Sequence, residues 1–461
     1  MIRIFKHHIA YPVLLLCIAD FAILLLVAEA GWVLRLRQAG LDIGSIWDRL
    51  PQLFTFAMAL LAAMVGVGVY TPEALQTYRF AAARLLAAIS LGVILISVMH
   101  FIMPTLTMWR SNSVISMVLA FILLLSARFI LRDFLRSDTF KRRVLLLGAG
   151  KRARRLADLA GRPGANFLIA ACVDMKDAPP QIETAICRTD VTNLRAFVDK
   201  HEVQEVVLAL DERRNTIPVD ALLRVKTAGV HVSDISTFLE RETGRIDLDT
   251  LRPSWLIFSD GFSSGQRLSL IFKRSFDLIV SAFVLLIASP IILITALAVK
   301  LESPGPAFYK QLRVGRYGEP FEILKLRSMR QDAEAGGAIW AQKGDSRVTR
   351  VGRIIRLIRV DELPQMWTVL KGGMSFVGPR PERPEFVADL EKQIPFYAER
   401  HMIKPGITGW AQINYPYGAS LEDARHKLEY DLYYTKNYSP FLDVLIILQT
   451  LRVLLWAEGA R

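Results

Sequence analysis

An adjacent pair of carboxylates stands close to several arginines in the stretch Arg356–Glu382. Asp361 and Glu362 come shortly after Arg356, and Arg380 lies further along between two prolines. A carboxylate can attack phosphorus or bind a hard cation, while guanidinium groups neutralise the oxygens of a transferring phosphoryl group. These residue types favour phosphoryl transfer. An Asp-Glu pair in the first turn of a solvated helix, stabilised by the helix dipole, is the structural alternative.

Arginine recurs at every third position before this pair, which predicts a helix with basic side chains around much of its surface. The series consists of Arg347, Arg350, Arg353, Arg356 and Arg359. Long basic side chains of this kind can extend into anionic lipid headgroups, and we expect the outer members to do so. Arg380 is different, because the prolines on both sides fix φ and make the position of its guanidinium reproducible.

Composition indicates a membrane protein rather than an ordinary soluble enzyme. Of the 461 residues 52% are hydrophobic, and the net charge is +13. Basic flanks of membrane spans, or a surface for anionic ligands, explain this charge. No nucleic-acid reader module is visible, so nucleic acid is not an expected partner. Cys17, Cys172 and Cys187 form no metal-binding pattern and are expected to be reduced. Hydrolase motifs such as Walker, HExxH and nucleophile-elbow sequences do not occur.

The first part of the chain contains four apolar runs, each close to the ~20 residues that cross a bilayer as a helix. They are Pro12–Val33, Leu53–Tyr70, Leu85–Met103 and Val114–Ile130. Ten Lys or Arg residues flank one side of the four runs and four flank the other. This asymmetry predicts that the N-terminus and everything after residue 131 are cytoplasmic. Asp20 and Glu29 fall in or near the first run, where an acid has either a functional role or a role in helix packing.

Strands and helices alternate between about residues 141 and 240, which predicts a small parallel sheet with right-handed crossovers. The first strand, over Arg143–Leu147, leads into Gly148-Ala149-Gly150 and a helix over Lys151–Ala160, and the second strand spans Phe167–Val173. Such a loop can bind a pyrophosphate, and Asp174 at the end of the second strand could bind a ribose hydroxyl. The alternative, which we favour, is a degenerate Rossmann-like module that packs and regulates without redox chemistry.

A fifth apolar run, Ser275–Lys300, introduces the last part of the chain. Its length fits a membrane span, but Ser289-Pro290 interrupts it near the middle. A full span would also place Asp361 on the side away from the cytoplasm and from nucleotide-activated donors. We therefore predict a re-entrant helix with a break at Pro290, in which the Ser289 hydroxyl helps to satisfy the carbonyl that proline leaves without a donor.

Four motifs in order resemble the bacterial sugar transferases that prime exopolysaccharide synthesis, the polyprenyl-phosphate hexose-1-phosphate transferases. The motifs are DELPQ, KGGMS, VGPRPE and KPGITGWAQIN, which begins at Lys404. The resemblance implies that Asp361 is the nucleophile, and that Arg356 and Arg380 bind substrate phosphate. It also implies that Lys325, in KLRSM, belongs to the active site, and that the Ser-Pro pair forms the membrane hairpin of this family.

The activity implied by the resemblance is a two-step transfer at the cytoplasmic face of the bacterial inner membrane. Asp361 would attack the sugar-linked phosphorus of a UDP-sugar, and undecaprenyl phosphate would then accept the sugar phosphate. Mg²⁺ would be held at Asp361, with Glu362 as a metal ligand or base. Membrane lipids are expected partners, and a homodimer is compatible with the family.

The expected fold is a membrane protein of α plus α/β class in four parts. Residues 1–140 form a four-helix transmembrane bundle, 141–240 a Rossmann-like cytoplasmic domain, 241–265 a linker, and 266–461 a catalytic domain with a re-entrant membrane helix. Two rival functions stay open: a membrane-anchored nucleotide-sensing scaffold of polysaccharide assembly, and a lipid transporter. The intact set of Lys325, Arg356, Asp361, Glu362 and Arg380 favours the enzyme.

Overall fold

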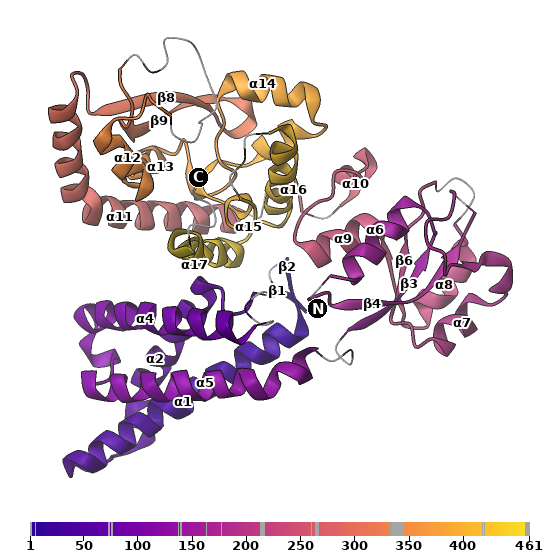
Figure 1. The fold of residues 1–461 in the computed structure, drawn as a ribbon, viewed down its shortest axis with the longest axis horizontal. Coiled ribbons are helices and arrows are strands. Elements are labelled where there is room, and N and C mark those ends of the chain that lie inside the picture. The colour runs from indigo at the N-terminus through magenta and orange to yellow at the C-terminus, as the bar shows by residue number, and fades with distance from the viewer. Residues whose placement is uncertain are drawn as a thin grey trace. The chain divides into compact units, whose positions relative to one another are not determined.

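The computed structural model describes residues 2–456 apart from a set of short segments. These are residues 5, 72–73, 75–76, 137, 139–140, 163, 177, 213–216, 260, 263–266, 332, 334–344, 417 and 419. The chain forms two compact units, Met1–Thr250 and Leu251–Arg461 (Figure 1). The boundary between them falls within the segment predicted to be a linker, of which residues 263–266 lie outside the described residues.

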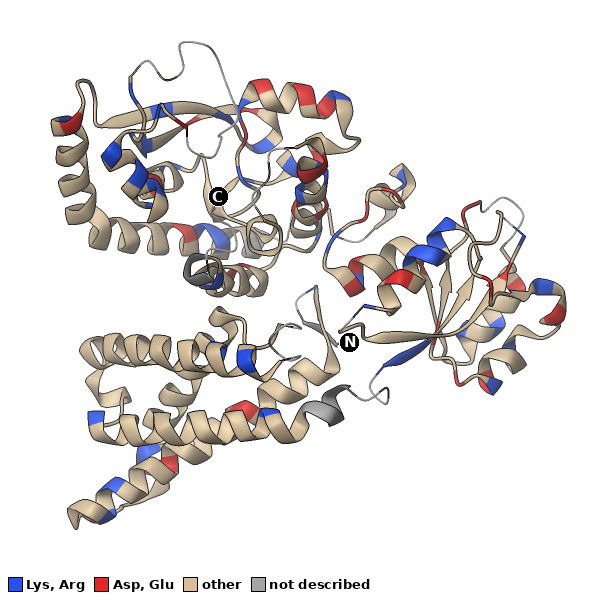
Figure 2. Ribbon diagram, viewed as in Figure 1, with Lys and Arg blue, Asp and Glu red and all other residues tan. Residues whose placement is uncertain are grey.

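Four long helices make up the first part of unit 1, and the four apolar runs lie in them. They are α1 (Tyr11–Ala39), α2 (Ile46–Val67), α4 (Tyr78–Ile102) and α5 (Arg110–Arg136), preceded by a hairpin of β1 (Ile2–Ile4) and β2 (His7–Ile9). Helix α1 packs against α2 and α5, and α4 packs against the same two helices. Charged residues are sparse along them (Figure 2). The second apolar run extends three residues beyond the end of α2, because Gly68 adopts a positive φ and caps the helix.

Both acids of the first apolar run are used in contacts between helices. Asp20 is fully buried and accepts hydrogen bonds from Arg128 Nη1 at 2.8 Å and from the Tyr70 hydroxyl at 2.8 Å. Glu29 Oε2 accepts from Arg49 Nε at 2.7 Å. Because a buried charge is tolerated when it is paired and hydrogen-bonded, these contacts favour the helix-packing role over a functional one.

The rest of unit 1 is the predicted parallel sheet, with strand order β5-β4-β3-β6-β7. The strands are β3 (Arg142–Leu147), β4 (Phe167–Asp174), β5 (Ile186–Cys187), β6 (Glu205–Leu208) and β7 (His231–Asp234). This is the doubly wound order of Rossmann-like folds, and the order reverses between β3 and β6. Ligands of such sheets bind at the carboxyl ends of the strands at this point, where the Gly148–Gly150 loop lies.

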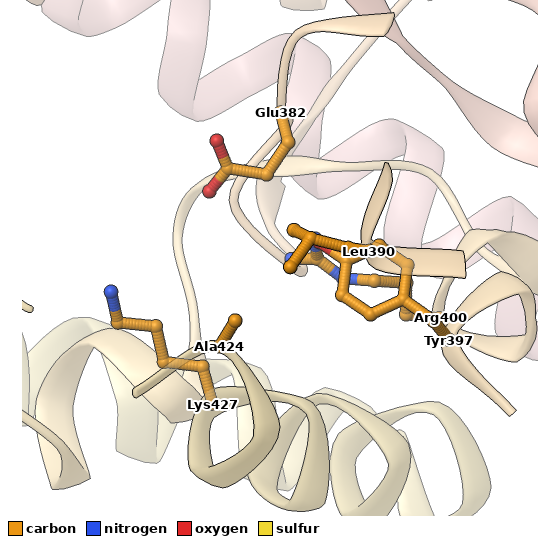
Figure 3. A pocket seen from close by; sticks show the side chains of 6 residues that line it. All are labelled: Glu382, Leu390, Tyr397, Arg400, Ala424 and Lys427. Carbon is orange, nitrogen blue, oxygen red and sulfur yellow. The ribbon is translucent and has the colours of Figure 1, made fainter. Parts of the chain in front are cut away.

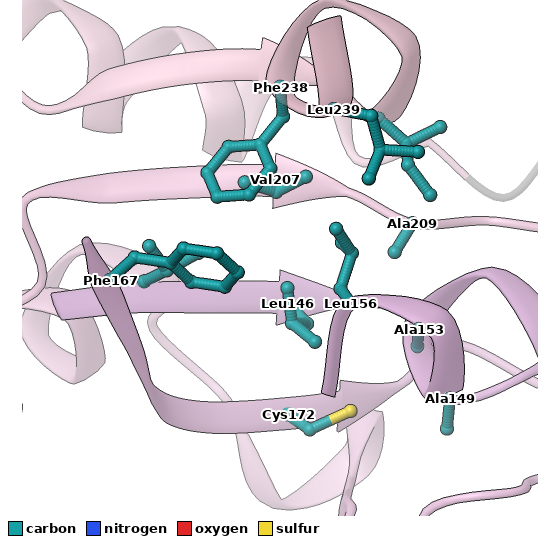
Figure 4. Close-up of a cluster of buried hydrophobic side chains, with 12 residues drawn as sticks. Leu146, Ala149, Ala153, Leu156, Phe167, Cys172, Val207, Ala209, Phe238 and Leu239 are labelled. Atoms are coloured by element: carbon teal, nitrogen blue, oxygen red, sulfur yellow. The ribbon is translucent and has the colours of Figure 1, made fainter. Parts of the chain in front are cut away.

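Successive residues of a strand point to opposite faces of the sheet, and helices cover both faces, so the side chains on both faces are buried. Val144 and Leu146 of β3 pack in a cluster with α6 and α9, which also holds the edge-to-face rings of Phe167 and Phe238 (Figure 4). Leu145 and Leu147 pack in a second cluster on the other face, with α7 and α8. The helices are α6 (Lys151–Ala160), α7 (Leu194–Lys200), α8 (Val219–Thr227) and α9 (Ile235–Thr243).

Unit 2 consists of many short elements around two small sheets. It begins with α10 (Pro253–Phe258) and α11 (Arg267–Glu302), followed by the antiparallel pair β8 (Phe308–Val314) and β9 (Pro320–Leu326). Then come α12 (Arg350–Leu357), the 3-10 turn η5 (Val360–Glu362), α13 (Gln365–Lys371) and β10 (Ser375–Val377). The chain continues with α14 (Pro384–Gln393), η6 (Tyr397–Met402) and β11 (Gly406–Thr408), which pairs with β10 in parallel. The last elements are α15 (Trp410–Asn414), α16 (Leu421–Asn437) and α17 (Pro440–Trp456).

Helix α11 carries the fifth apolar run and is continuous through Pro290. Proline cannot donate to the carbonyl four residues earlier, that of Leu286. The Ser289 hydroxyl takes over this role and donates to Leu286 O at 2.8 Å. The ribbon of α11 follows one edge of the unit and then turns before it leads to β8 (Figure 1). The helix therefore has no interruption at Pro290, and the Ser289 hydroxyl bonds to the carbonyl that the proline leaves without a donor. Re-entry into the membrane stays a prediction.

The first turns of α11 are joined to the rest of unit 2 by polar contacts. Lys273 Nζ donates to Asp443 Oδ2 at 2.7 Å and to Val377 O at 3.1 Å. Asp277 Oδ1 accepts from Ser375 Oγ and from Phe376 N, both at 2.9 Å. The later part is different, because apolar side chains such as Ile279 and Leu286 are about 70% exposed, at 69% and 73%. The helix is thus anchored at its start and offers an apolar surface beyond.

Replacing Lys273 by methionine is expected to destabilise unit 2 by about 3 kcal/mol, because Asp443 would keep a buried charge without its cation. The side chains of this pair are 15% and 5% exposed. The matched control is Lys310→Met, whose pair with Glu322 is 68% and 59% exposed and is worth about 0–1 kcal/mol. Thermal melting in detergent checks this. Equal melting temperatures for the two variants would contradict the buried pair.

Candidate active site

A residue with left-handed backbone conformation directly precedes the segment that carries the carboxylate pair. Helix α12 ends at Leu357, and Arg359 then adopts a φ of 59°. This turns the chain into η5, which carries Asp361 and Glu362 just before α13. The prediction of one helix through all five arginines is wrong, because Arg347 precedes α12 and Arg359 follows it. Positive φ is uncommon for a residue with a side chain, so this turn is a specific feature of the site.

Glu362 is the centre of a cluster of three cations. Its Oε1 accepts from Arg380 Nη2 at 2.6 Å and from Lys325 Nζ at 3.2 Å, and its Oε2 lies 3.8 Å from Arg359 Nη1. Burial alone would raise the pKa of Glu362, but the charges of Arg380, Lys325 and Arg359 outweigh it and hold this pKa well below its usual range. Glu362 is therefore ionised at any pH at which the protein works.

Asp361 has a different environment. It is 7% exposed, and its Oδ1 is buried without a hydrogen-bond partner among the atoms that the structure describes. Burial, and then the negative charge of Glu362, raises the pKa of Asp361. A buried carboxylate oxygen that lacks a partner calls for an explanation. Next to three cations, it suits a nucleophile or a ligand for a cation.

Apolar packing holds the two halves of the site together. Leu326, which follows Lys325 on β9, and Val360, which precedes Asp361, belong to one buried cluster with Val299 and Ile355. Each apolar side chain thereby fixes the backbone of the polar residue beside it. The site is consequently built on a strand and a packed turn rather than on a long loop, which favours reproducible geometry.

The Pro379–Pro381 segment, which carries Arg380, is held by strand β8. Arg313 Nη1 of β8 donates to Pro381 O at 3.0 Å, and Val314 N donates to Glu382 O at 2.9 Å. The carbonyl of Arg380 accepts from Arg400 Nη2 at 3.0 Å. Pro379 and Pro381 each have a fixed φ, and Pro381 also restricts the residue before it to extended backbone, so Arg380 has a defined position from which it reaches Glu362.

The structure brings together four of the predicted site residues: Lys325, Asp361, Glu362 and Arg380. Arg356 lies in the last turn of α12, before Asp361 in the chain, and its Nη2 contacts Met329 Sδ at 3.9 Å. Its positive charge partly offsets the rise in the pKa of Asp361. Ser289 and Pro290 lie in α11, where they shape the helix. The three-residue spacing predicts an interfacial place for Arg359 and does not predict its contact with Glu362, nor does the sequence predict the contact of Arg313 with Pro381. Their positions beside the carboxylates and beside the Pro-Arg-Pro motif depend on contacts distant in sequence.

The donor set fits Mg²⁺ in one specific way. Among the residues that the structure describes, no group of three His, Cys, Asp or Glu side chains could hold a metal ion. Glu362 is already engaged by cations, which leaves Asp361 with its unpartnered Oδ1. Mg²⁺ is commonly bound by one or two carboxylates together with substrate phosphates and water. The site therefore fits an ion held by Asp361 and completed by a phosphorylated substrate.

The second candidate site, the Gly148–Gly150 loop, is filled by a side chain. The backbone N–H groups of Lys151 and Arg152 at the start of α6 donate to the Asp211 carboxylate at 2.8 Å and 3.1 Å. A pyrophosphate in a Rossmann fold occupies this position at the helix N-terminus. Asp211 therefore occupies the anion position, which favours the interpretation of this domain as a degenerate module.

Fold and site together define a protein with long apolar helices, a Rossmann-like sheet and a buried carboxylate pair beside three cations. A family model described as bacterial sugar transferase matches residues 268–457, and one described as CoA-binding domain matches residues 66–233. The chain belongs to the bacterial sugar transferase family, which confirms the resemblance.

Three curated relatives illustrate the range of the family. The UDP-N-acetylgalactosamine-undecaprenyl-phosphate N-acetylgalactosaminephosphotransferase of Aeromonas hydrophila is 45% identical over 52% of this chain and 56% of its own length. The UDP-glucose:undecaprenyl-phosphate glucose-1-phosphate transferase of Caulobacter vibrioides is 43% identical over 41% of this chain and 71% of its own length. The uncharacterized sugar transferase EpsL of Bacillus subtilis is 42% identical over 41% of this chain and 90% of its own length. The match thus spans little more than half of the Aeromonas relative.

Coenzyme A does not fit the Gly148–Gly150 loop as the structure has it, because Asp211 holds the amides that a phosphate would need. We expect millimolar CoA or NAD⁺ to leave the melting temperature of the wild-type protein unchanged, since a ligand stabilises only what it binds. A saturable increase in melting temperature, abolished by mutation of the loop, would show that Asp211 yields to a ligand.

Proposed function

We propose that the protein transfers hexose-1-phosphate from a UDP-sugar to undecaprenyl phosphate and releases UMP, which initiates exopolysaccharide or capsule synthesis. The observation that carries this proposal is the buried, unpartnered Oδ1 of Asp361 beside Glu362 and its three cations. Two of the relatives are named as enzymes that transfer a sugar phosphate to undecaprenyl phosphate, and these names support the same reaction here.

In the first step, an oxygen of Asp361 attacks the sugar-linked phosphorus of the donor. A bond from the carboxylate to phosphorus forms, the bond from phosphorus to UMP breaks, and UMP leaves with the electron pair. In the second step, a phosphate oxygen of undecaprenyl phosphate attacks the same phosphorus and Asp361 is released. Arg380, Lys325 and Arg359 neutralise the phosphoryl oxygens throughout. Bound Mg²⁺ would neutralise further charge on the diphosphate, with Asp361 as its carboxylate ligand.

Glu362 is assigned a positioning role in this mechanism. A general base works best when its pKa lies near the working pH, whereas the pKa of Glu362 is held far below that range. Its carboxylate, next to Asp361 in the chain, instead holds Arg380 and Lys325 in place by hydrogen bonds. This assignment refines the role of metal ligand or base that the sequence suggested.

Five long apolar helices in the described part of the chain support a location in the membrane: α1, α2, α4, residues 110–131 of α5, and residues 270–302 of α11. We propose that the first four form a transmembrane bundle and that α11 re-enters, with its bend at Pro290 in the bilayer. Helix α12 exposes Ile354 and Leu357 next to its arginines, which suits the lipid interface. This arrangement would place the site on the cytoplasmic face of the inner membrane.

Cysteine labelling tests the re-entrant helix. In a background without the native cysteines, Lys300→Cys at the end of α11 and Lys200→Cys in the sheet domain are expected to be protected from an impermeant maleimide in intact spheroplasts. Asp42→Cys, between α1 and α2, is expected to react. All three positions are exposed. Reaction of Lys300→Cys in intact spheroplasts would show that α11 crosses the membrane fully.

The function is tested by UMP release in nanodiscs with undecaprenyl phosphate, Mg²⁺ and a panel of UDP-sugars that includes UDP-glucose and UDP-N-acetylgalactosamine. Release with one or a few donors, dependent on undecaprenyl phosphate, is the expected result. Silence with folded protein across the panel would favour the nucleotide-sensing scaffold. That alternative has little support at the Gly148–Gly150 loop, where Asp211 occupies the anion position.

A further inference from the structure

Lys404 is a cation that the mechanism above does not use. It begins the KPGITGWAQIN motif, is partly buried, and has no hydrogen-bond or ion-pair partner among the residues that the structure describes. The pocket in Figure 3 shows the ordinary situation, because each of its cations has a partner: Arg400 donates to Asp431 Oδ2 at 2.7 Å, and Lys427 donates to Gly418 O at 2.5 Å. A partly buried charge without a partner therefore calls for an explanation.

Arg274, near the start of α11, borders the same space as Lys404. A Cβ atom placed on Gly372 would lie 3.6 Å from Arg274 Nη2 and 3.7 Å from Lys404 Nζ. Arg274 is fixed there by the end of α13, because its Nη1 donates to Val369 O at 2.7 Å and its Nη2 to Leu370 O at 2.8 Å. These acceptors are neutral carbonyls, so the guanidinium keeps its full positive charge beside Lys404.

Arg316 is the third cation of this group, which we call the Lys404 cluster. Its Nε donates to Met402 O at 3.2 Å, and its guanidinium lies 4.5 Å from the centre of the Tyr317 ring. In the described part of the chain, none of the three cations forms an ion pair with a carboxylate. The cluster is thus a local excess of positive charge.

The electrostatic effect of this excess falls on Lys404. Burial lowers the pKa of its ammonium, and the charges of Arg274 and Arg316 lower it further. Asp277 opposes this lowering, but its buried carboxylate already accepts from Ser375 Oγ at 2.9 Å. An anion bound among the three cations would replace their repulsion by attraction.

The Lys404 cluster borders the part of unit 2 that suits a membrane. Arg274 belongs to α11, which is long and apolar enough to cross a bilayer, and Ile271 and Ile279 of this helix are 61% and 69% exposed. Trp367 of α13, which packs against α11, is about half exposed, and Tyr317 is largely exposed. Tryptophan and tyrosine are enriched where proteins meet lipid headgroups, and basic clusters at this level attract anionic lipids.

We propose that Lys404, Arg274 and Arg316 bind the phosphate of an anionic phospholipid beside the start of α11. Lysine supplies a point charge and arginine a planar set of donors, and both are common ligands of phosphate. The inference goes beyond the proposed transfer reaction, since it concerns a lipid that is not consumed.

The test is lipid binding by native mass spectrometry in detergent, with phosphatidylglycerol or with phosphatidylcholine of the same acyl chains. Lys404→Gln is expected to weaken the tightest binding of phosphatidylglycerol about tenfold, because one charge-assisted contact is lost. Binding of phosphatidylcholine should be the same in both proteins. Lys404→Arg should retain most of the affinity. Lys392→Gln is the matched control, since Lys392 is 76% exposed on α14 and should not affect either lipid.

Melting temperatures separate this role from a structural one. In phosphatidylcholine nanodiscs, Lys404→Gln should melt no lower than the wild type, because it loses a repelling charge and no partner. Phosphatidylglycerol should then stabilise the wild type more than the variant. A variant that melts well below the wild type in neutral lipid would show a structural role and overturn the proposal.

Three other results would also overturn it. Equal phosphatidylglycerol affinity in wild type and Lys404→Gln would show that the cluster binds no headgroup. If that affinity were equal while the KM for undecaprenyl phosphate rose, the cluster would bind the acceptor. If it were equal while millimolar inorganic phosphate raised the melting temperature of the wild type alone, the ligand would be a soluble anion. The lipid-binding measurement needs no turnover, so its outcome does not depend on the transferase proposal.

Discussion

Asp361→Asn is expected to lower UMP release by about 10³-fold or more, the scale of loss when a covalent nucleophile is removed. Asparagine has nearly the same shape, so the packing around Val360 and the contacts of Glu362 should persist. The amide, however, is neutral and cannot form the bond to phosphorus. Stopped reactions with donor labelled in the sugar should show a protein-bound sugar phosphate in the wild type and none in this variant.

The control for this variant is Asp389→Asn on α14, an exposed aspartate whose contact with Lys392 is 3.8 Å. It makes the same chemical change away from the carboxylate pair and should leave the rate within about twofold of the wild type. Retention of more than a tenth of wild-type UMP release in Asp361→Asn, at an equal melting temperature, would exclude Asp361 as the nucleophile. The reaction would then be a direct transfer between the two substrates.

The sheet domain could be predicted from periodicity alone. The strand over Arg143–Leu147, the helix over Lys151–Ala160 and the strand over Phe167–Val173 all appear in the structure within a residue of the predicted bounds. Such apolar strands and short helices leave few alternatives, because both sheet faces must be buried. Asp211 could not be predicted as the residue that fills the loop, since it arrives there from the end of a different strand.

The sequence of α11 could not show whether its proline ends the helix or lies within it. A proline in a helical pattern usually ends or kinks the helix, and the chain alone does not say which. The Ser289 hydroxyl compensates for the bond lost at Leu286, and the helix continues. The buried contacts of Lys273 and Asp277 explain why charged residues begin an otherwise apolar helix. These partners lie about a hundred residues or more away, beyond the reach of a local pattern.

The candidate site was predicted from motifs, and the structure adds how it is assembled. Lys325 and Arg380 lie on separate elements, yet both contact one oxygen of Glu362. Arg359 could not be identified, because three-residue spacing predicted a continuous helix. Its left-handed backbone instead ends the helix and brings its guanidinium toward Glu362. Local spacing cannot predict a turn of this kind, which depends on the packing of Val360 behind it.

Glu362→Gln is expected to lower UMP release about 10²-fold and to move the pH profile. The amide can still accept a hydrogen bond, but it carries no charge to hold Arg380, Lys325 and Arg359 together. Loss of one preorganised electrostatic contact commonly costs about 10²-fold in rate. Partial repulsion among the three cations should also lower the melting temperature, because buried charges without a counter-charge are costly.

The direction of the pH shift follows from the pKa of each remaining group. Asp361 must be ionised to attack, so its pKa sets the acidic limb of kcat/KM. The negative charge of Glu362 raises the pKa of Asp361, and its removal should move the acidic limb to lower pH. Burial lowers the pKa of Lys325, and the negative charge of Glu362 raises it again. Without that charge the pKa of Lys325 should fall. If Lys325 acts as a cation, the alkaline limb of the profile should therefore move to lower pH. Both limbs are therefore expected to shift to lower pH. If Glu362 were the general base, its own ionisation would set the acidic limb, and Glu362→Gln would remove that limb. The pH profiles of kcat/KM for the wild type and Glu362→Gln separate these outcomes.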